Sequence, residues 1–202
     1  GWDDPRLVTL KTLKRRGIIK EVLDELVNHI GLSKSQINID FAMIASISRK
    51  ILDKKAKRYF FVHNPVSLKI LKMPKIKEIK AKIHPEKAEE RTISVGENIF
   101  ISKDDYDSLK NKEVRLMNLF NINLGEKPYF TGMENKDIQK IQWVSKNAVK
   151  TKIIMENGKW ISGIAEPSIT ELSAGEIIQF ERFGFARLDK KGDEYEFWFS
   201  HK

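Results

Sequence analysis

Apolar residues recur at helical spacing in the first third of the chain. Ile18, Val22, Leu26 and Ile30 lie four residues apart, and Gly31 follows the last of them. This spacing places the four side chains along one face of a helix, and a glycine just past the last apolar position is a common helix end. The pattern therefore predicts a helix over residues 18–30.

Two further helices are expected, one on either side. Asp3 or Asp4 before Pro5 is typical of a helix start, because aspartate caps free backbone amides and proline suits the first turn. Gly17 would end this helix. Asp40 is expected to cap the other, whose inward face carries the apolar residues Phe41, Ile44, Ile47 and Ile51. The first part of the chain thus predicts a helical subdomain.

From Tyr59 onward the pattern changes to short runs of β-type residues separated by prolines and glycines. In the segment KTKIIMENGKWISGI, Asn157 and Gly158 stand where a two-residue hairpin turn requires a positive φ, and ARLDKKGDEYEFWF is a second hairpin candidate. Many short strands at this spacing are typical of a barrel or a sandwich. The expected fold class is mainly β with an N-terminal helical subdomain.

The composition is that of a globular protein. Of the 202 residues, 41% are hydrophobic, which suffices for a core, and none is cysteine, which excludes disulfides and thiolate metal sites. No apolar run reaches the roughly 18 positions of a membrane span, and no secretory signal pattern is present. These features favour a cytoplasmic protein that does not bind membranes.

Charge distinguishes the two halves of the chain. Residues 1–90 carry 20 Lys and Arg against 11 Asp and Glu, so the whole net charge of +9 lies there, and residues 91–202 are neutral overall. Such a field attracts polyanions, nucleic acid first among them, because each neutralised phosphate releases counterions. A lysine-rich surface that simply faces solvent is the alternative interpretation.

Patterns typical of catalytic or metal-binding sites are not found. The four histidines, His29, His63, His84 and His201, lack the spacing of metal ligands, and the chain has no glycine-rich phosphate loop and no nucleophile elbow. We therefore expect no catalytic residue, metal site or cofactor in this chain.

Five stretches together resemble one known family. They are GWDDPRLVTLKTLKRRGI at 1–18, KEVRLMN at 112–118, QWVSKNA at 142–148, GIAEPSI at 163–169 and IIQFERFGFARLD at 177–189. In order and approximate spacing they resemble the C-terminal, anticodon-binding region of glutaminyl-tRNA synthetases and of archaeal and eukaryotic-type glutamyl-tRNA synthetases. The resemblance covers nearly all of the chain.

The resemblance implies a fold. A helical subdomain over residues 1–58 would contact tRNA, followed by two β-barrels that grip the anticodon loop. The distal barrel, over 119–166, would be an insertion in the proximal barrel, which 59–118 and 167–202 would form together.

The resemblance also implies contacts with the tRNA backbone and stem. The basic opening helix would supply Lys11, Lys14, Arg15 and Arg16. Lys34 and Ser35 match positions that contact the inside of the tRNA in glutaminyl enzymes, although Ser35 departs from the glutamine found there.

The same alignment with the family implies which residues would contact the bases of the anticodon. Arg58, Gln179 and Arg182 match three positions of a pocket for the middle base, a uridine, and Arg115 matches a residue near the first base. The chemistry is suitable, because glutamine offers a donor and an acceptor to a base edge and arginine presents a fork of donors. The three pocket residues would have to converge from distant parts of the chain.

One departure distinguishes the two kinds of enzyme. Before KEVRL, glutaminyl enzymes carry a Lys-Arg pair that reads guanine at the third anticodon position, whereas this chain has Tyr106 and Asp107. Glutamate anticodons end in cytosine, whose amino group can donate to an aspartate such as Asp107. Together with the shorter segment between KEVRLMN and QWVS, this departure favours a glutamyl enzyme.

The resemblance finally implies a reaction for the parent enzyme, which joins glutamate to tRNA with ATP and Mg²⁺. Both ATP signatures of that family would lie upstream of Gly1, so the chain is expected to be a non-catalytic fragment of a class I glutamate-tRNA ligase, with a catalytic domain as its partner. The same region of a glutaminyl enzyme and a stand-alone RNA-binding barrel protein stay open as alternatives.

Overall fold

Three helices precede the first strand in the computed structural model, which describes residues 2, 4–31 and 40–202. They are α1 (Leu10–Arg16), α2 (Lys20–Ile30) and α3 (Phe41–Leu52). As expected, Gly17 ends α1 with a φ of 90°, and the Asp40 carboxylate caps α3. The helices share a buried cluster formed by Leu13, Ile18, Val22, Leu26 and Ile44.

The start of α1 differs from the expectation. The helix begins at Leu10, where the Thr9 hydroxyl accepts a hydrogen bond from a backbone amide of the first turn at 3.1 Å. The Asp4 carboxylate instead binds the backbone amide and the side chain of Arg6, so it is not available to cap α1. The other candidate cap, Asp3, lies outside the described residues.

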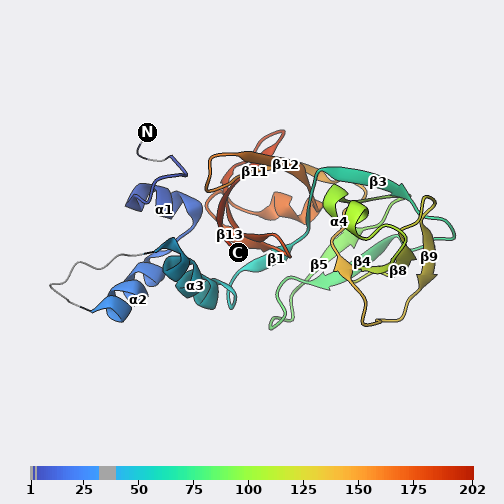
Figure 1. Ribbon diagram of the computed structural model, residues 1–202, viewed down its shortest axis with the longest axis horizontal. Coiled ribbons are helices and arrows are strands. Elements are labelled where there is room, and N and C mark those ends of the chain that lie inside the picture. Colours follow the sequence, from blue (N-terminus) through green and yellow to red (C-terminus); the bar gives the residue numbers. More distant parts are fainter. Residues whose placement is uncertain (1, 3, 32–39) are drawn as a thin grey trace.

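Seven strands form a sheet that curls into a nearly closed barrel, which we call the first barrel (Figure 1). In sheet order they are β1 (Lys57–Tyr59), β13 (Ile177–Phe180), β14 (Gly184–Lys190), β15 (Tyr195–His201), β11 (Val149–Ile154), β12 (Trp160–Ala165) and β2 (Phe61–His63). A 3-10 helix, η1 (Pro167–Glu171), follows β12. Because Phe60 alone separates β1 from β2, the two edges of the sheet come together.

A close approach of two strands requires a glycine in the first barrel. Gly163 of β12 is the register partner of His63 in β2, and a Cβ atom at this position would collide with the Val62 carbonyl oxygen. Only a residue without a Cβ fits, which gives the GIAEPSI stretch a structural reason for its first glycine.

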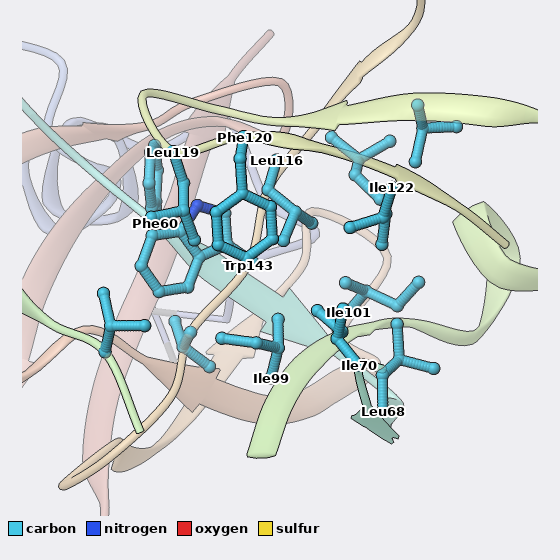
Figure 2. Close-up of a cluster of buried hydrophobic side chains, with 14 of the residues drawn as sticks. Phe60, Leu68, Ile70, Ile99, Ile101, Leu116, Leu119, Phe120, Ile122 and Trp143 are labelled. Atoms are coloured by element: carbon cyan, nitrogen blue, oxygen red, sulfur yellow. The ribbon is translucent and has the colours of Figure 1, made fainter. Parts of the chain in front are cut away.

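A second group of elements lies between β2 and β11 in the chain, and we call it the inserted unit. It comprises β3 (Pro65–Lys69), β4 (Glu78–Lys82), β5 (Glu90–Ser94), β6 (Asn98–Ser102), α4 (Lys103–Ser108), β7 (Glu113–Leu116), β8 (Asn121–Asn123), β9 (Tyr129–Gly132) and β10 (Lys140–Ile141). β3 pairs with β6, β4 with β5, and the other four form one sheet. Figure 2 shows the buried side chains between these sheets, among them Ile99, Ile101, Leu116, Phe120 and Trp143.

The fold class, mainly β with N-terminal helices, is confirmed. The boundaries between the two β-rich units, however, fall at other residues than expected. We expected a distal barrel over 119–166, whereas β11 and β12 pair with β15 and β2 of the first barrel. The elements of the inserted unit span residues 65–141. Hydrophobic alternation identifies a strand, but it does not specify which distant strand will pair with it.

The helical subdomain docks on the last strand of the first barrel. The Arg16 guanidinium donates to the carbonyl oxygens of Phe199 and Ser200, at 3.1 and 2.8 Å. From α3, Arg49 Nε donates to the Lys202 carbonyl oxygen at 2.8 Å. Figure 1 shows the resulting order along the molecule, with the helices at one end, the first barrel in the middle and the inserted unit at the other end.

A buried ion pair joins the first barrel to the inserted unit. Arg91 of β5 is 5% exposed, and Glu166, directly after β12, is fully buried. Arg91 Nε donates to one Glu166 oxygen at 2.6 Å, and the other oxygen accepts from the Phe60 amide at 2.8 Å. Arg91 also donates to the Lys82 carbonyl oxygen and, at 3.3 Å, to the Glu181 carboxylate. Both charges therefore have the partners that burial requires.

A second contact between the two units uses the QWVS stretch. The Gln142 side-chain oxygen accepts from the Phe61 amide at 2.9 Å, and the Trp143 ring centre lies 6.2 Å from that of Phe60. The two consecutive backbone amides of Phe60 and Phe61 thus donate to Glu166 and to Gln142, respectively. Two of the stretches that carry the family resemblance therefore build the junction.

Replacing Arg91 by methionine should lower the free energy of unfolding by about 3–5 kcal/mol, because the Glu166 carboxylate would stay buried without its counter-charge. The matched control is Lys80→Met on the neighbouring strand, because the Lys80–Glu90 ion pair is exposed and 4.0 Å long. That variant should lose less than about 1 kcal/mol. Urea titrations followed by tryptophan fluorescence measure both losses, and small, equal losses would contradict the role given to the buried pair.

Candidate nucleic-acid interface

Two of the residues expected to read a base are neighbours across two strands. β1 and β13 run parallel, and Arg58 is the register partner of Gln179. Tyr59 and Phe180, the next residues on these strands, belong to the core of the first barrel, and successive residues of a strand point to opposite faces. Arg58 and Gln179 therefore lie side by side on the outer face of the barrel, although most of the β strands separate them in the chain.

Arg58 is held by an acid at the end of the helical subdomain. Its Nη2 donates to Asp53 Oδ1 at 3.0 Å, and its side chain is 24% exposed. Asp53 is the C-cap residue, directly after the last residue of α3. The Nε of Arg58 is buried and has no hydrogen-bond partner among the described residues. The guanidinium is thus fixed through its Nη2 atom.

Arg182 lies in the turn between β13 and β14, three residues after Gln179. Its backbone φ is 60°, in the left-handed region that residues with a side chain seldom occupy. Both terminal nitrogens of its guanidinium donate to the Asp105 carboxylate of α4, each at 2.9 Å. Because α4 belongs to the inserted unit, this ion pair is a further contact between the two units.

A small pocket lies between the two units at Arg182. It has a volume of about 110 Å³ and is lined by Phe61, Val62, His63, Ser102, Asp104, Asp105, Gln142 and Arg182. Within it, His63 Nε2 and Asp104 Oδ2 lie 3.0 Å apart. Glu181, directly before Arg182, is bound by Arg91, and burial raises the pKa of the Glu181 carboxyl group. The pocket is therefore a polar site at the junction.

Arg115 lies apart from these three residues, on β7 of the inserted unit. Its Nη1 donates to the Asn121 side-chain oxygen at 2.9 Å and to the carbonyl oxygens of Glu134 and Met133 at 3.0 and 3.2 Å. These bonds attach the segment after β9 to the sheet. The hydrogen bonds of Arg115 thus all lie within the inserted unit, and its expected place near the first anticodon base stays a prediction.

The two residues at the position of the guanine reader have different surroundings. Tyr106 packs against the core of the inserted unit. Asp107 is exposed on α4 and pairs with Lys103 at 2.8 Å. Asp105 is two positions earlier, and residues two apart do not share a helix face. Asp107 therefore does not point toward Arg182.

The basic residues of α1 fall into two groups, which corrects the expectation that all four face RNA. Lys11 and Lys14 are exposed. Arg15 pairs with Asp189 of β14 at 2.8 Å, and Arg16 is buried against β15. Burial lowers the pKa of the Arg16 guanidinium. The two arginines attach the helix to the first barrel, because an arginine fork fits carboxylate and carbonyl groups at short range.

Three further expectations concern residues or groups outside this site. Lys34 and Ser35 lie outside the described residues. In the part of the chain that the structure describes, no group of three or more His, Asp or Glu residues could hold a metal ion. No helix of that part is long and apolar enough to cross a membrane.

The acids that hold the candidate arginines were missed by the sequence analysis. Asp53 and Asp105 carry no recognisable pattern, and both lie in charged stretches that are typical of a solvated helix surface. Their partners become visible only when α3 and α4 are placed beside the first barrel. A sequence signal could have come only from the bidentate preference of arginine for carboxylates, which does not say which carboxylate.

Two family models match the chain. Both are described as tRNA synthetases class I (E and Q), anti-codon binding domain, and they match residues 56–143 and 140–189. Together these matches cover most of the first barrel and the whole inserted unit, including Arg58, Gln179 and Arg182.

The chain is also similar to curated proteins along its whole length. A glutamate-tRNA ligase from Pyrococcus abyssi is 39% identical and one from Archaeoglobus fulgidus is 33% identical, each over 100% of this chain. One from Methanocaldococcus jannaschii is 35% identical over 96% of the chain. The chain spans only 37% or 38% of the length of these relatives.

Proposed function

Because the chain belongs to the family of anticodon-binding domains of class I tRNA synthetases for glutamate and glutamine, we propose that it recognises a tRNA anticodon at Arg58, Gln179 and Arg182. The observation that carries this proposal is the register of β1 and β13, which sets Arg58 beside Gln179. Arg182 follows in the turn after β13. The pocket that Arg182 lines includes neither Arg58 nor Gln179. An amide and a guanidinium side by side on an outer barrel face suit a base edge.

The physics of the cluster supports reading of a base rather than attraction of any phosphate. Arg58 and Arg182 are each paired with an acid, so their net charge is largely compensated. A compensated arginine keeps its directional donors but contributes less to the long-range field. The sequence-independent attraction would come from other cations, among which Lys11 and Lys14 are exposed.

We propose a glutamate tRNA as the partner. The relatives are named glutamate-tRNA ligases, and the position of the guanine reader of glutaminyl enzymes carries Tyr106 and Asp107. In this proposal the chain contributes recognition, while ATP and Mg²⁺ serve the part of a ligase that the chain does not span. The glutaminyl alternative differs in one outcome, because it requires tighter binding when the third anticodon base is guanine.

Replacing Gln179 or Arg58 by alanine should weaken binding of an anticodon stem-loop RNA with a middle uridine by roughly ten- to a hundredfold. The same substitutions should barely change the affinity for an RNA with a different middle base, because the wild-type side chains make no specific contact with that base. Fluorescence anisotropy with labelled stem-loops gives the dissociation constants. Gln139→Ala is the matched control, since Gln139 is an exposed glutamine near β10 of the inserted unit.

The middle-base proposal would be overturned if Gln179→Ala bound the middle-uridine RNA as tightly as Gln139→Ala does and kept the same preference over the RNA with a changed middle base. A wild-type chain that binds a guanine-ending anticodon more tightly than a cytosine-ending one would instead replace the glutamyl assignment by the glutaminyl one. The two outcomes depend on different bases of the same loop, so one set of RNAs separates them.

Replacing Lys11 and Lys14 together by alanine should weaken binding of all tRNAs alike and reduce the slope of log affinity against log salt by about one to two. The control removes the same charge at Lys127 and Lys159, which are exposed lysines in the inserted unit and in the β11–β12 hairpin. If net charge alone governs binding, both pairs will change the slope equally. An unchanged slope in the α1 variant would show that this face of the helix does not meet RNA.

A further inference from the structure

Arg182 is fixed by contacts from two sides before any ligand binds. From the inserted unit, both oxygens of Asp105 accept from its terminal nitrogens, each at 2.9 Å. The Asp105 side chain is 16% exposed and that of Arg182 is 37% exposed. On the backbone side, the next residue, Phe183, packs edge-on against Phe61 with ring centres 5.2 Å apart, which holds the turn in place.

The geometry of this pair leaves part of the guanidinium available. A guanidinium has five N–H donors in one plane, and an end-on pair through Nη1 and Nη2 uses two of them. The Nε–H and the adjacent Nη–H form a second fork, and among the described residues the Nε has no hydrogen-bond partner. Arg182 can therefore hold Asp105 and still offer two donors to a base edge.

Resting on the proposed anticodon function, we infer that Asp105 is a positioning residue that makes Arg182 selective for a base. It does so by two physical effects. It immobilises a side chain with many rotamers before the ligand arrives, so less conformational entropy is lost on binding. It also compensates the charge of Arg182, so the guanidinium attracts phosphates less and discriminates by the direction of its donors.

The inserted unit supplies a matched control. Asp137 is exposed between β9 and β10 and does not line the pocket at Arg182. Replacing Asp105 or Asp137 by asparagine therefore removes the same charge from the same unit. Only Asp105→Asn releases Arg182.

The experiment measures binding of anticodon stem-loop RNAs with a middle uridine or a middle adenosine, at several salt concentrations, for the wild-type chain, D105N, D137N and D105E. In D105N the ratio between the two RNAs should fall about tenfold. Its slope of log affinity against log salt should steepen by about 0.7–0.9, because one more cation is free to meet a phosphate. D137N should keep the wild-type ratio, and D105E should recover part of it.

Three results separate the possibilities. If the wild-type chain discriminates and D105N discriminates equally well, the inference is wrong while the proposed function stands. If D105N binds both RNAs more tightly with an unchanged ratio, Asp105 only competes with RNA for Arg182, and the inference is also wrong. If the wild-type chain itself does not discriminate, the proposed function fails and this inference with it.

Thermal melting identifies a variant that does not fold. In that event Arg182→Lys replaces D105N, because lysine keeps the charge and the pairing with Asp105 but has no fork. This variant should lose the discrimination and keep the wild-type salt slope. Retained discrimination in Arg182→Lys would show that the fixed fork is not what reads the base.

Discussion

An ion pair buried between two cores is stable only when every charge and lone pair in it is matched, and Arg91 and Glu166 meet this condition at the junction of the molecule. Arg91 comes from the inserted unit and Glu166 from the first barrel. Their remaining hydrogen bonds involve Phe60, Ser168 and Glu181 on the side of the first barrel and Lys82 of the inserted unit. The relative placement of the two units therefore follows from satisfying one pair of charges.

That placement positions the candidate site. Phe60, whose amide binds Glu166, lies two residues after Arg58, and Glu181, which binds Arg91, lies between Gln179 and Arg182 in the chain. The junction thus holds the strand and the turn that carry the proposed readers, and it brings α4 close enough for Asp105 to bind Arg182. A surface made from two units needs such a rigid joint, because a small misplacement removes directional hydrogen bonds.

Patterns within a short stretch of sequence predicted most of the local structure. The helical stripe, the glycine that ends α1, the Asp40 cap and the change to β-rich texture were all right, because they depend on neighbours in the chain. The resemblance also named Arg58 and Gln179, whose proximity no periodicity requires. Arg15 and Arg16 were misplaced, because a short stretch of sequence does not show whether an arginine faces solvent or binds another part of the chain. The bounds of the two units were wrong because strand partners are chosen by distant packing.

Hydrogen exchange of the chain with and without an anticodon stem-loop that carries a middle uridine tests the central claim most directly, because it reports on both units in one measurement. We expect amides of β1, of the turn between β13 and β14, and of α4 to exchange more slowly together when the RNA is bound. Protection confined to one unit, or to the lysine-rich stretch from β3 to β4, would contradict a recognition surface shared across the junction.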